Sequence, residues 1–507
     1  MVKVESLHAG TSPRPSHSIL VALLAAVPVI GSYVWFATTG TWRSWPGGTT
    51  YYDQLANAFR AGHAWLDAKP EPLLLALADP YDPSQRQNVP HLWDASLFEG
   101  RYYLYFGPVP ALLLTAAKTI HPMQLRDVQI AFAFTCGIFF MLELLILRIW
   151  KRGFADIPAL VVACMIAAVG LMHPYPWSLG NRAWVHDSAI AAGTFFFLAG
   201  LYAALLSLAD AKTSGRWALA AGCSWGLAIG SRMAQLVPVL FVVALVFLGT
   251  RQAGGVRAVR SVRRRVIPGL ALPLAIAIAA LGLYNYSRFR SVFEFGQTYQ
   301  LAFLNLHANS TDIFSFNYVV QNLHNYLFMP PKLRLNFPWI WMQMGIRRPL
   351  LPGLGMPPLY FSEIITGLLY TTPVLVLALL PVIWRRRGPK NGGKAEPSGG
   401  AVGWLEIALG GSALATFAFF LCYFWASTRF SMDFLPSVHL LGLMGFWRLE
   451  RRWRQVPIAR VSLLVLGTGL LAASVLISLL LAIGLNASEF RKLNPEFWMQ
   501  LNNLLRP

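Results

Sequence analysis

Apolar runs close to the length of a membrane-spanning helix recur along the whole of this 507-residue chain, and short basic blocks separate them. About 20 apolar residues cross the hydrocarbon core of a bilayer as one α-helix. Hydrophobic residues make up 56% of the chain, and the mean hydropathy is +0.50. Because helices satisfy their own backbone hydrogen bonds in lipid, the sequence predicts an all-α polytopic membrane protein.

The net charge of +20 could indicate a nucleic-acid-binding protein. However, the lysine and arginine residues lie in short blocks between apolar runs and not in one basic domain with interleaved aromatic residues. Basic loops on the cytoplasmic side of a membrane explain this distribution better. All four cysteines fall inside apolar runs, so the sequence indicates no disulfide framework.

The positive-inside rule also determines the predicted topology. If 103–120 crossed the membrane, every later basic block would lie outside, and Pro108 and Pro110 break this segment near its start. We therefore expect 103–120 to lie in the outer interface. The same rule divides 217–248 into two short passes with Arg232 at their outer turn. Eleven spans are then expected, at 18–37, 128–149, 157–174, 188–208, two within 217–248, 266–285, 361–384, 403–423, 434–449 and 461–485.

This topology divides the chain into five parts. They are a cytoplasmic N-terminus at 1–17, a transmembrane module at 18–285 with a large first extracytoplasmic loop at 38–127, an extracytoplasmic segment at 286–360, C-terminal transmembrane helices at 361–485 and an extracytoplasmic tail at 486–507. The expected location is a bacterial inner (plasma) membrane. The loops with chemical variety share one side, which indicates a site at the outer face.

The first loop contains the leading candidate for catalysis. Seven of the 22 acidic residues fall between 37 and 120, and Asp53 lies in the amphipathic stretch YYDQLANAF with Tyr52, Leu55 and Phe59 at helical spacing. A carboxylate beside apolar groups at a membrane surface has its pKa raised toward that of a general base. A capping or solvated acid is the alternative, and Asp94 is assigned to that ordinary class.

Further candidates lie in the later outer segments. His186 and Asp187 make metal binding conceivable, although Asp187 also suits a helix N-terminus; no HExxH, CxxC or Walker sequence occurs. Arginine side chains suit a phosphate, with an acidic neighbour or lipid headgroup as the alternative. The four-residue spacing of Arg429 and Asp433 favours an ion pair. The candidates for substrate or phosphate binding are Arg182, His186, Asp187, Arg232, Arg288, Glu294, Tyr299 and Arg429.

The chain resembles the GT-C superfamily of integral membrane glycosyltransferases, which take sugar from a polyprenyl-phosphate donor. The resemblance consists of an early acid in a large first outer loop (Asp53), the closing segment FGPVPALLL, a second outer turn with an acid (Asp187) and the hairpin AGCSWGLAIGSR with a basic tip (Arg232). It is nearest to the protein mannosyltransferase and aminoarabinose transferase branch. Asp53-Gln54 replaces the Asp-Glu pair of the mannosyltransferases, and FGPVP replaces their HPP or KPP motif.

This resemblance implies that Asp53 deprotonates the hydroxyl of a glycan, lipid or protein acceptor. Arg232, Arg288 and Arg429 would stabilise the departing polyprenyl phosphate. It leaves the need for a divalent metal open and implies no other cofactor.

Two other classes of function remain as alternatives. A transporter or flippase for a lipid-linked substrate would carry ionisable residues near the middle of its spans, whereas Glu143 and Glu406 lie nearer the inner ends. A non-catalytic protein of envelope assembly would use the first loop as a docking surface.

Overall fold

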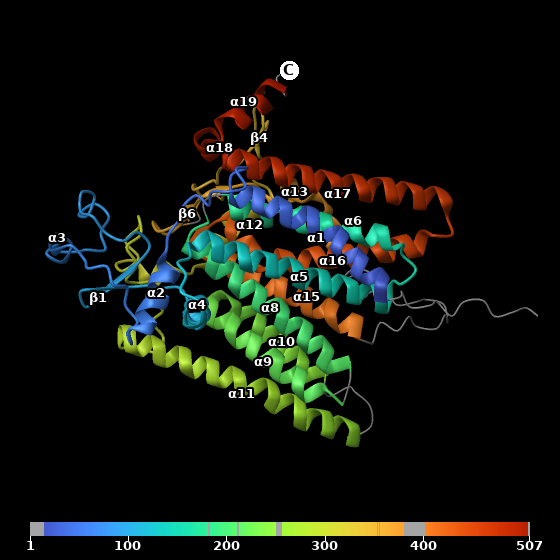
Figure 1. Ribbon diagram of the computed structural model, residues 1–507, viewed down its shortest axis with the longest axis horizontal. Helices are drawn as coiled ribbons and strands as arrows, with labels where there is room; N and C mark the ends of the chain where they lie inside the picture. The colour runs from blue at the N-terminus through green and yellow to red at the C-terminus, as the bar shows by residue number, and fades with distance from the viewer. Residues whose placement is uncertain are drawn as a thin grey trace, which may run out of the picture.

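The computed structural model describes residues 15–180, 183–209, 212–249, 256–351, 353, 355–379 and 401–504. Long helices run side by side as a bundle, and the segment between α1 (Pro15–Ala37) and α5 (Asp127–Gly153) gathers at one end of it (Figure 1). Residues of this segment share a cavity with the turn between α9 (Ser214–Ser231) and α10 (Leu236–Gly249). We call this part of the molecule the loop end.

Six described helices are long and apolar enough to cross a membrane, which makes the chain an integral membrane protein. They are α1, α5, α8 (Val185–Ala209), α11 (Val256–Phe289), α15 (Ala401–Leu421) and α17 (Pro457–Leu485). Shorter apolar helices are α4 (Val109–Ile120), α6 (Ala159–Leu171) and α10 with the preceding 3₁₀ helix η1 (Met233–Gln235). The predicted class is therefore confirmed, but these described helices do not establish the predicted total of eleven spans.

The other elements are mostly short. The helices are α2 (Tyr51–Arg60), α3 (Pro72–Leu75), α7 (Tyr175–Gly180), η2 (Ser310–Asp312), η3 (Phe316–Tyr318), α12 (Val319–Leu327), α13 (Leu368–Thr371), η4 (Pro373–Leu379), η5 (Thr428–Asp433), α16 (Leu435–Trp453), α18 (Ala487–Leu493) and α19 (Pro495–Leu504). Antiparallel pairs are β1 (Ser96–Phe98) with β2 (Arg101–Tyr103), β3 (Lys332–Leu333) with β4 (Ile340–Trp341), and β5 (Gln343–Met344) with β7 (Ile364–Ile365); β6 (Phe361–Ser362) and β8 (Trp425–Ala426) are parallel.

The prediction of one membrane-spanning helix at 361–384 is wrong over its described part. This stretch begins with the strands β6 and β7, and the amide of Phe361 donates to the carbonyl of Phe424 at 2.9 Å. Because these backbone groups pair with residues distant in sequence, 361–365 is extended, and only the short helices α13 and η4 follow where one continuous helix was expected. It contributes to the wall of the loop end.

The predicted division of 217–248 into two helices is confirmed. Arg232 has an extended backbone, with φ −152° and ψ 119°, and this conformation ends α9 before η1 and α10 begin. Along α9, a side chain at Gly222 would place its Cβ 2.6 Å from the carbonyl oxygen of Leu270 in α11. Small residues of this kind let two helices of a membrane protein approach closely.

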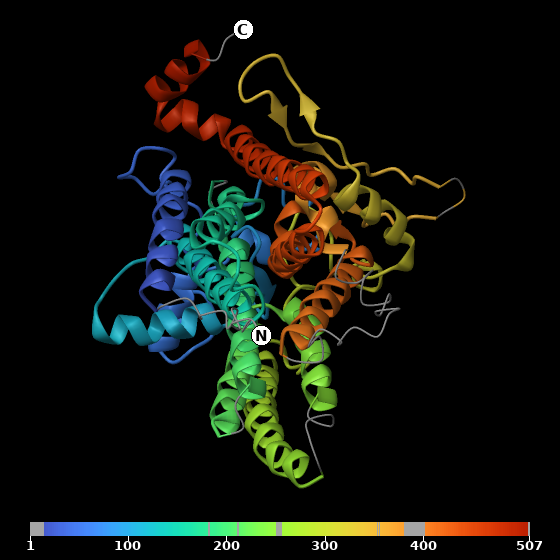
Figure 2. The ribbon, with the colours of Figure 1, turned by 90° about the vertical axis from the view of Figure 1, so that its right-hand side faces the viewer.

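The first loop is fastened to the bundle through α2 and α4. The carboxylate of Asp127, at the start of α5, accepts from the amides of Tyr51 and Tyr52 at 3.0 and 3.3 Å. It therefore satisfies and neutralises the N-terminal end of α2. The α4 helix is seen end-on in Figure 1 and at full length in Figure 2, so it lies across the bundle. This orientation agrees with the predicted interfacial helix.

The buried apolar residues form two principal groups, one within the bundle and one at the loop end. The larger group follows the bundle helices and includes Trp150, Trp225 and Trp447. The second lies beneath the first loop and includes Leu97 together with Leu301, which comes from a much later segment. The later segment is held there because the amide of Leu301 donates to the carbonyl of Ala95 at 2.9 Å.

Gly107, in the sequence FGPVP, is the point at which the first loop touches the α9–α10 turn. A Cβ atom at Gly107 would lie 2.6 Å from the carbonyl carbon of Gly230 and 2.9 Å from that of Ser231. These are backbone atoms, so no side chain can rotate away to make room. Only glycine therefore allows this contact.

We predict that Gly107→Ala lowers the thermal stability of the purified protein, because the added methyl forces the first loop away from the turn. The expected cost is about 1–3 kcal/mol, as for overpacking elsewhere. Gly31→Ala is the matched control, since a Cβ at Gly31 meets no atom within 4 Å. Equal melting temperatures for Gly107→Ala and the wild type would contradict the close contact.

Candidate functional site

A cavity of about 700 Å³ opens at the loop end. Its volume is that of a small-molecule site. Its wall comes mainly from the first loop, the start of α8, the α9–α10 turn, residues 295–306 and residues 419–430, and Leu281, Phe314 and Glu363 complete it. The polar lining side chains are Asp94, Tyr105, His186, Arg232, Gln297, Gln300, Glu363, Tyr423 and Arg429.

Asp94 contributes a carboxylate to this wall. Its backbone has φ +60°, a left-handed conformation that is uncommon for a residue with a side chain. The amide of Asp94 donates to the carbonyl of Leu301 at 3.3 Å, and Gln300 Nε2 donates to Asp94 Oδ1 at 3.0 Å. Burial raises the pKa of Asp94, and the nearby guanidinium of Arg429 opposes this effect.

Arg429 and Glu363 form a pair with two hydrogen bonds in the wall. Arg429 Nη2 lies 2.7 and 2.6 Å from the two carboxylate oxygens of Glu363, and Ser427 Oγ donates to Oε2 of Glu363 at 2.6 Å. Another terminal nitrogen of Arg429 contacts His186 Nε2. Glu363, between β6 and β7, and Arg429, in η5, therefore fix each other.

His186 and Asp187 lie at the start of α8, where the sequence placed them. Asp187 Oδ2 is 3.1 Å from His186 Nε2 and accepts from the amide of Trp184 at 3.0 Å. This second contact shows the carboxylate at the helix N-terminus, which was the alternative role considered for Asp187. His186 borders the cavity, whereas Asp187 stands behind it and orients the ring.

Arg232 borders the cavity from the α9–α10 turn. Its Nε donates to Asp433 Oδ2 at 2.9 Å, and Gln235 Nε2 donates to Asp433 Oδ1 at 2.8 Å. The Asp433 side chain is fully buried. The predicted pair between Arg429 and Asp433 is therefore wrong. Residues 428–433 form the 3₁₀ helix η5, whose three-residue turn does not align positions four apart.

Asp53 is not among the residues that line the cavity. Its Oδ1 lies 2.7 Å from Lys118 Nζ and accepts from the amide of Leu125 at 2.9 Å. Asn57 Nδ2 donates to Oδ2 at 3.4 Å. The structure therefore places Asp53 as a link between α2, α4 and the start of α5, apart from the arginines that the sequence grouped with it.

Three other predicted site residues also lie outside the cavity lining. Arg288 is buried, donates to the carbonyl of Leu104 at 2.5 Å and stacks on Tyr284. Glu294 accepts from the amide of Gly296 and from Thr298, which closes a local turn, and Tyr299 packs among other aromatic rings. Arg182 lies outside the described residues.

The described residues do not provide a set of side chains placed to bind a metal ion. Within them, no group of three or more His, Cys, Asp or Glu side chains is placed to hold a metal ion. His186 and Asp187, the predicted pair, instead contact each other, and His186 also contacts Arg429.

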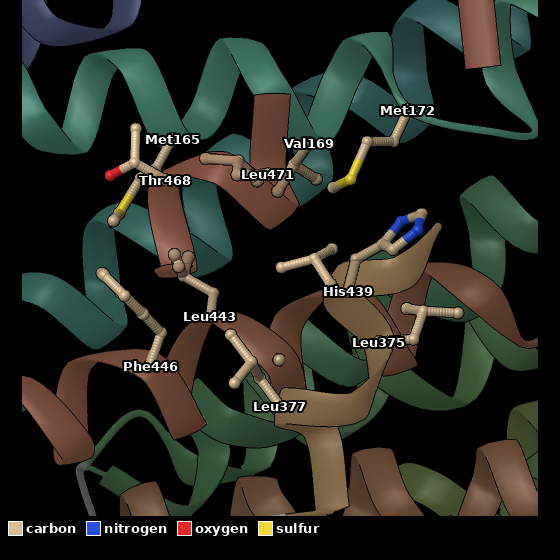
Figure 3. Close-up of a pocket in the computed structure, with 13 residues that line it drawn as sticks. Met165, Val169, Met172, Leu375, Leu377, His439, Leu443, Phe446, Thr468 and Leu471 are labelled. Atoms are coloured by element: carbon tan, nitrogen blue, oxygen red, sulfur yellow. The ribbon is translucent and has the colours of Figure 1, made fainter. Parts of the chain in front are cut away.

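A second cavity, of about 40 Å³, lies between α6, η4, α16 and α17 (Figure 3). Met, Leu, Val and Phe side chains surround it, and His439 and Thr468 are its polar lining residues. Its volume admits water-sized molecules but not a sugar. The large cavity is therefore the candidate site.

Sequence analysis missed Asp94, Glu363, Gln297 and Gln300. Asp94 was treated as an ordinary loop acid because nothing in its neighbourhood distinguishes it from the other acids of the first loop. The segment with Glu363 was assigned to a membrane span. Only the long-range pairing of 94–97 with 299–301 and of β6 with β8 brings these residues to the cavity.

Among the comparisons with known proteins, the one with solved structures found proteins of similar architecture. No protein-family model matches the chain, and no curated protein is significantly similar to it. The solved apo structure of the Archaeoglobus fulgidus oligosaccharyltransferase matches 97% of this chain with a TM-score of 0.54 and 12% identity. This chain spans only 60% of the length of that protein.

Another similar structure is ArnT from Cupriavidus metallidurans bound to undecaprenyl phosphate, with a TM-score of 0.42, 11% identity, and coverage of 93% of this chain and 76% of that one. The match with the oligosaccharyltransferase shows the fold without showing the substrate. This chain thus has a fold similar to that of the GT-C membrane glycosyltransferases.

Proposed function

We propose that this protein is a membrane glycosyltransferase that moves a sugar from a polyprenyl-phosphate donor to an acceptor hydroxyl. The observation that carries the proposal is one cavity in which a carboxylate with a raised pKa, Asp94, shares the wall with Arg232, Arg429 and His186. Acid–base chemistry and phosphate binding need these groups together. The GT-C-like fold supports the same class of reaction.

The lining of the cavity suits a lipid-linked donor. Apolar side chains on its α10 and α15 sides offer a surface for an isoprenoid chain; they include Leu236, Val237, Phe419 and Phe420. Arg232 adjoins this surface, and its Nε is engaged by Asp433. We assign the terminal nitrogens of Arg232 to the donor phosphate, because a guanidinium matches two phosphate oxygens.

Asp94 is assigned as the general base. It would take the proton from the acceptor hydroxyl while that oxygen bonds to the anomeric carbon of the sugar. The bond from the anomeric carbon to the phosphate oxygen breaks in the same step, and polyprenyl phosphate leaves with the electron pair. Arg232 then stabilises the charge on the leaving group. This assignment moves the catalytic role from Asp53, which we regard as a positioning residue of the first loop.

The positive-inside rule supports an extracytoplasmic location for the loop end. The α16 helix begins beside the cavity wall at η5 and ends in a basic turn with Arg451 and Arg452. Its 19 residues correspond to about 28 Å of helix at 1.5 Å per residue. Arg451 and Arg452 therefore lie about one helix length from the cavity wall, and we propose that the loop end faces the extracytoplasmic side.

The test of the function is an assay of the purified protein in lipid nanodiscs with radiolabelled polyprenyl-phosphate sugars. A glycosyltransferase releases polyprenyl phosphate and passes the label to an acceptor or to water. In sealed vesicles, donor that changes leaflet without any product would support a flippase instead. Donor that is neither converted nor moved would contradict both functions.

We predict that Asp94→Asn lowers kcat about 10²- to 10⁴-fold, since the amide cannot accept the proton. The folded state should persist because the amide oxygen still accepts from Gln300. Asp53→Asn instead leaves the buried Lys118 without its carboxylate, and it should cost about 3 kcal/mol of stability. Parallel kinetics and thermal unfolding distinguish them. Loss of turnover in a fully stable Asp53→Asn would return the catalytic role to Asp53.

The pH profile of kcat/KM gives a second prediction. The base must be ionised, and the fraction of ionised Asp94 falls as the pH drops through its pKa. Because burial raises that pKa, activity should decline on the acid side at a higher pH than for an ordinary aspartate. A decline at the ordinary position would show that Asp94 is not the titrating group.

Arg232→Lys should raise KM for the donor and lower kcat, together about 10²-fold in kcat/KM. Arg232 can donate to Asp433 through Nε and to the phosphate through its terminal nitrogens. A lysine has only one ammonium group, for which Asp433 and the phosphate would compete. Arg290→Lys is the control, because Arg290 is exposed and outside the cavity wall. Similar kinetics for both variants would remove Arg232 from phosphate binding.

A further inference from the structure

Four aromatic side chains form a connected group at the edge of the large cavity, and we call them the aromatic shelf: Trp93, Phe303, Phe361 and Trp425. Trp93, Phe303 and Trp425 belong to the cavity lining. Trp93 and Phe303 are still 36% and 38% exposed, so part of each ring is open to an incoming molecule. Such exposed apolar surface beside a site commonly serves binding.

The four rings of the shelf form one connected group. The rings of Trp93 and Phe303 are stacked, with centroids 6.1 Å apart and an angle of 10° between their planes. Phe303 is 4.9 Å from Trp425 and 4.7 Å from Phe361, and Phe361 is 4.6 Å from Trp425. These are ordinary separations for interacting aromatic pairs.

Contacts with Arg347 and Tyr51 hold the shelf in place in the absence of a ligand. The guanidinium of Arg347 lies 3.8 Å from the centroid of Phe361, and its Nε donates to the carbonyl of Ser362 at 3.2 Å. At the other end, the hydroxyl of Tyr51 donates to the carbonyl of Trp93 at 2.7 Å. A surface that is already ordered loses little entropy on binding.

Hydrogen-bonding groups stand directly beside the rings. Asp94 follows Trp93 in the sequence, and Gln300, its hydrogen-bond partner, lines the same cavity. Gln297 is a third polar neighbour in the lining. Flat aromatic rings next to carboxylate and amide groups match a sugar, which has an apolar C–H face and a rim of hydroxyls. An alkyl alcohol would use the rings but leave the amides unmatched.

An aromatic belt at the membrane interface is the ordinary explanation for exposed tryptophans. Belt residues face lipid headgroups, whereas three of the four shelf residues line the cavity that contains Asp94 and Arg232. The location therefore favours ligand binding.

We propose that the aromatic shelf binds a saccharide acceptor, with the C–H faces of its sugar rings against the shelf and a hydroxyl at Asp94. This inference rests on the proposed glycosyl transfer and names the acceptor class for the same cavity. The acceptor is then a glycan or the sugar headgroup of a glycolipid. A peptide acceptor is the competing class.

Saturation-transfer NMR on the protein in nanodiscs tests the proposal with maltose, cellobiose and a serine- and threonine-containing peptide as probes. We expect transfer to the ring C–H protons of at least one disaccharide. Trp93→Ala and Trp425→Ala should each weaken its binding about tenfold. Trp93→Phe, which keeps a flat ring, should restore most of the affinity.

Trp453→Ala is the matched control, since Trp453 is an exposed tryptophan at the far end of α16. It should bind the disaccharide like the wild type, and thermal unfolding should show that all four variants are folded. The proposal is overturned if neither disaccharide binds, if the folded shelf variants bind normally, or if only the peptide binds.

The same wild-type preparation separates this inference from the proposed function. Consumption of polyprenyl-phosphate sugar without disaccharide binding would contradict the proposed acceptor class and still support the proposed glycosyltransferase activity. Shelf-dependent disaccharide binding without consumption of any donor would support a saccharide site and contradict glycosyl transfer.

Discussion

The contact between Gly107 and the backbone of Gly230 determines how the two halves of the cavity meet. One half comes from the first loop with Asp94, and the other comes from the α9–α10 turn with Arg232. A contact between two backbones leaves no side chain to yield, so the distance between the halves is nearly fixed. The short helix α2, with its N-terminus on Asp127, holds the loop in the same position.

Each arginine of the cavity is held by its own carboxylate. Asp433 holds Arg232, and Glu363 holds Arg429, so the charges are oriented before a substrate enters. Burying such pairs costs desolvation free energy that their attraction only partly offsets, which makes stability a weak reason for their presence. Orientation of charge before a substrate binds is the better reason, because preorganised charges would stabilise the leaving phosphate of the proposed transfer.

The sequence predicted those features of the fold that depend on residues close together in the chain. The helix around Leu55, the break at Arg232 and the helical segment after FGPVP could be predicted, because local periodicity and charge determine them. The position of Asp94 in the cavity wall could not be predicted, since it depends on pairing with Leu301, far along the chain. The same limit explains why Asp53 was grouped with the arginines, although it contacts Lys118 and is not among the residues that line the cavity.

A cryo-EM structure of the protein with a non-hydrolysable polyprenyl-phosphate sugar would test the central claim most directly. The account predicts the phosphate against Arg232, the isoprenoid chain along the α10 and α15 side of the large cavity, and the anomeric carbon within reach of an acceptor oxygen held by Asp94. Donor bound next to Asp53 and Lys118, with the large cavity empty, would contradict it.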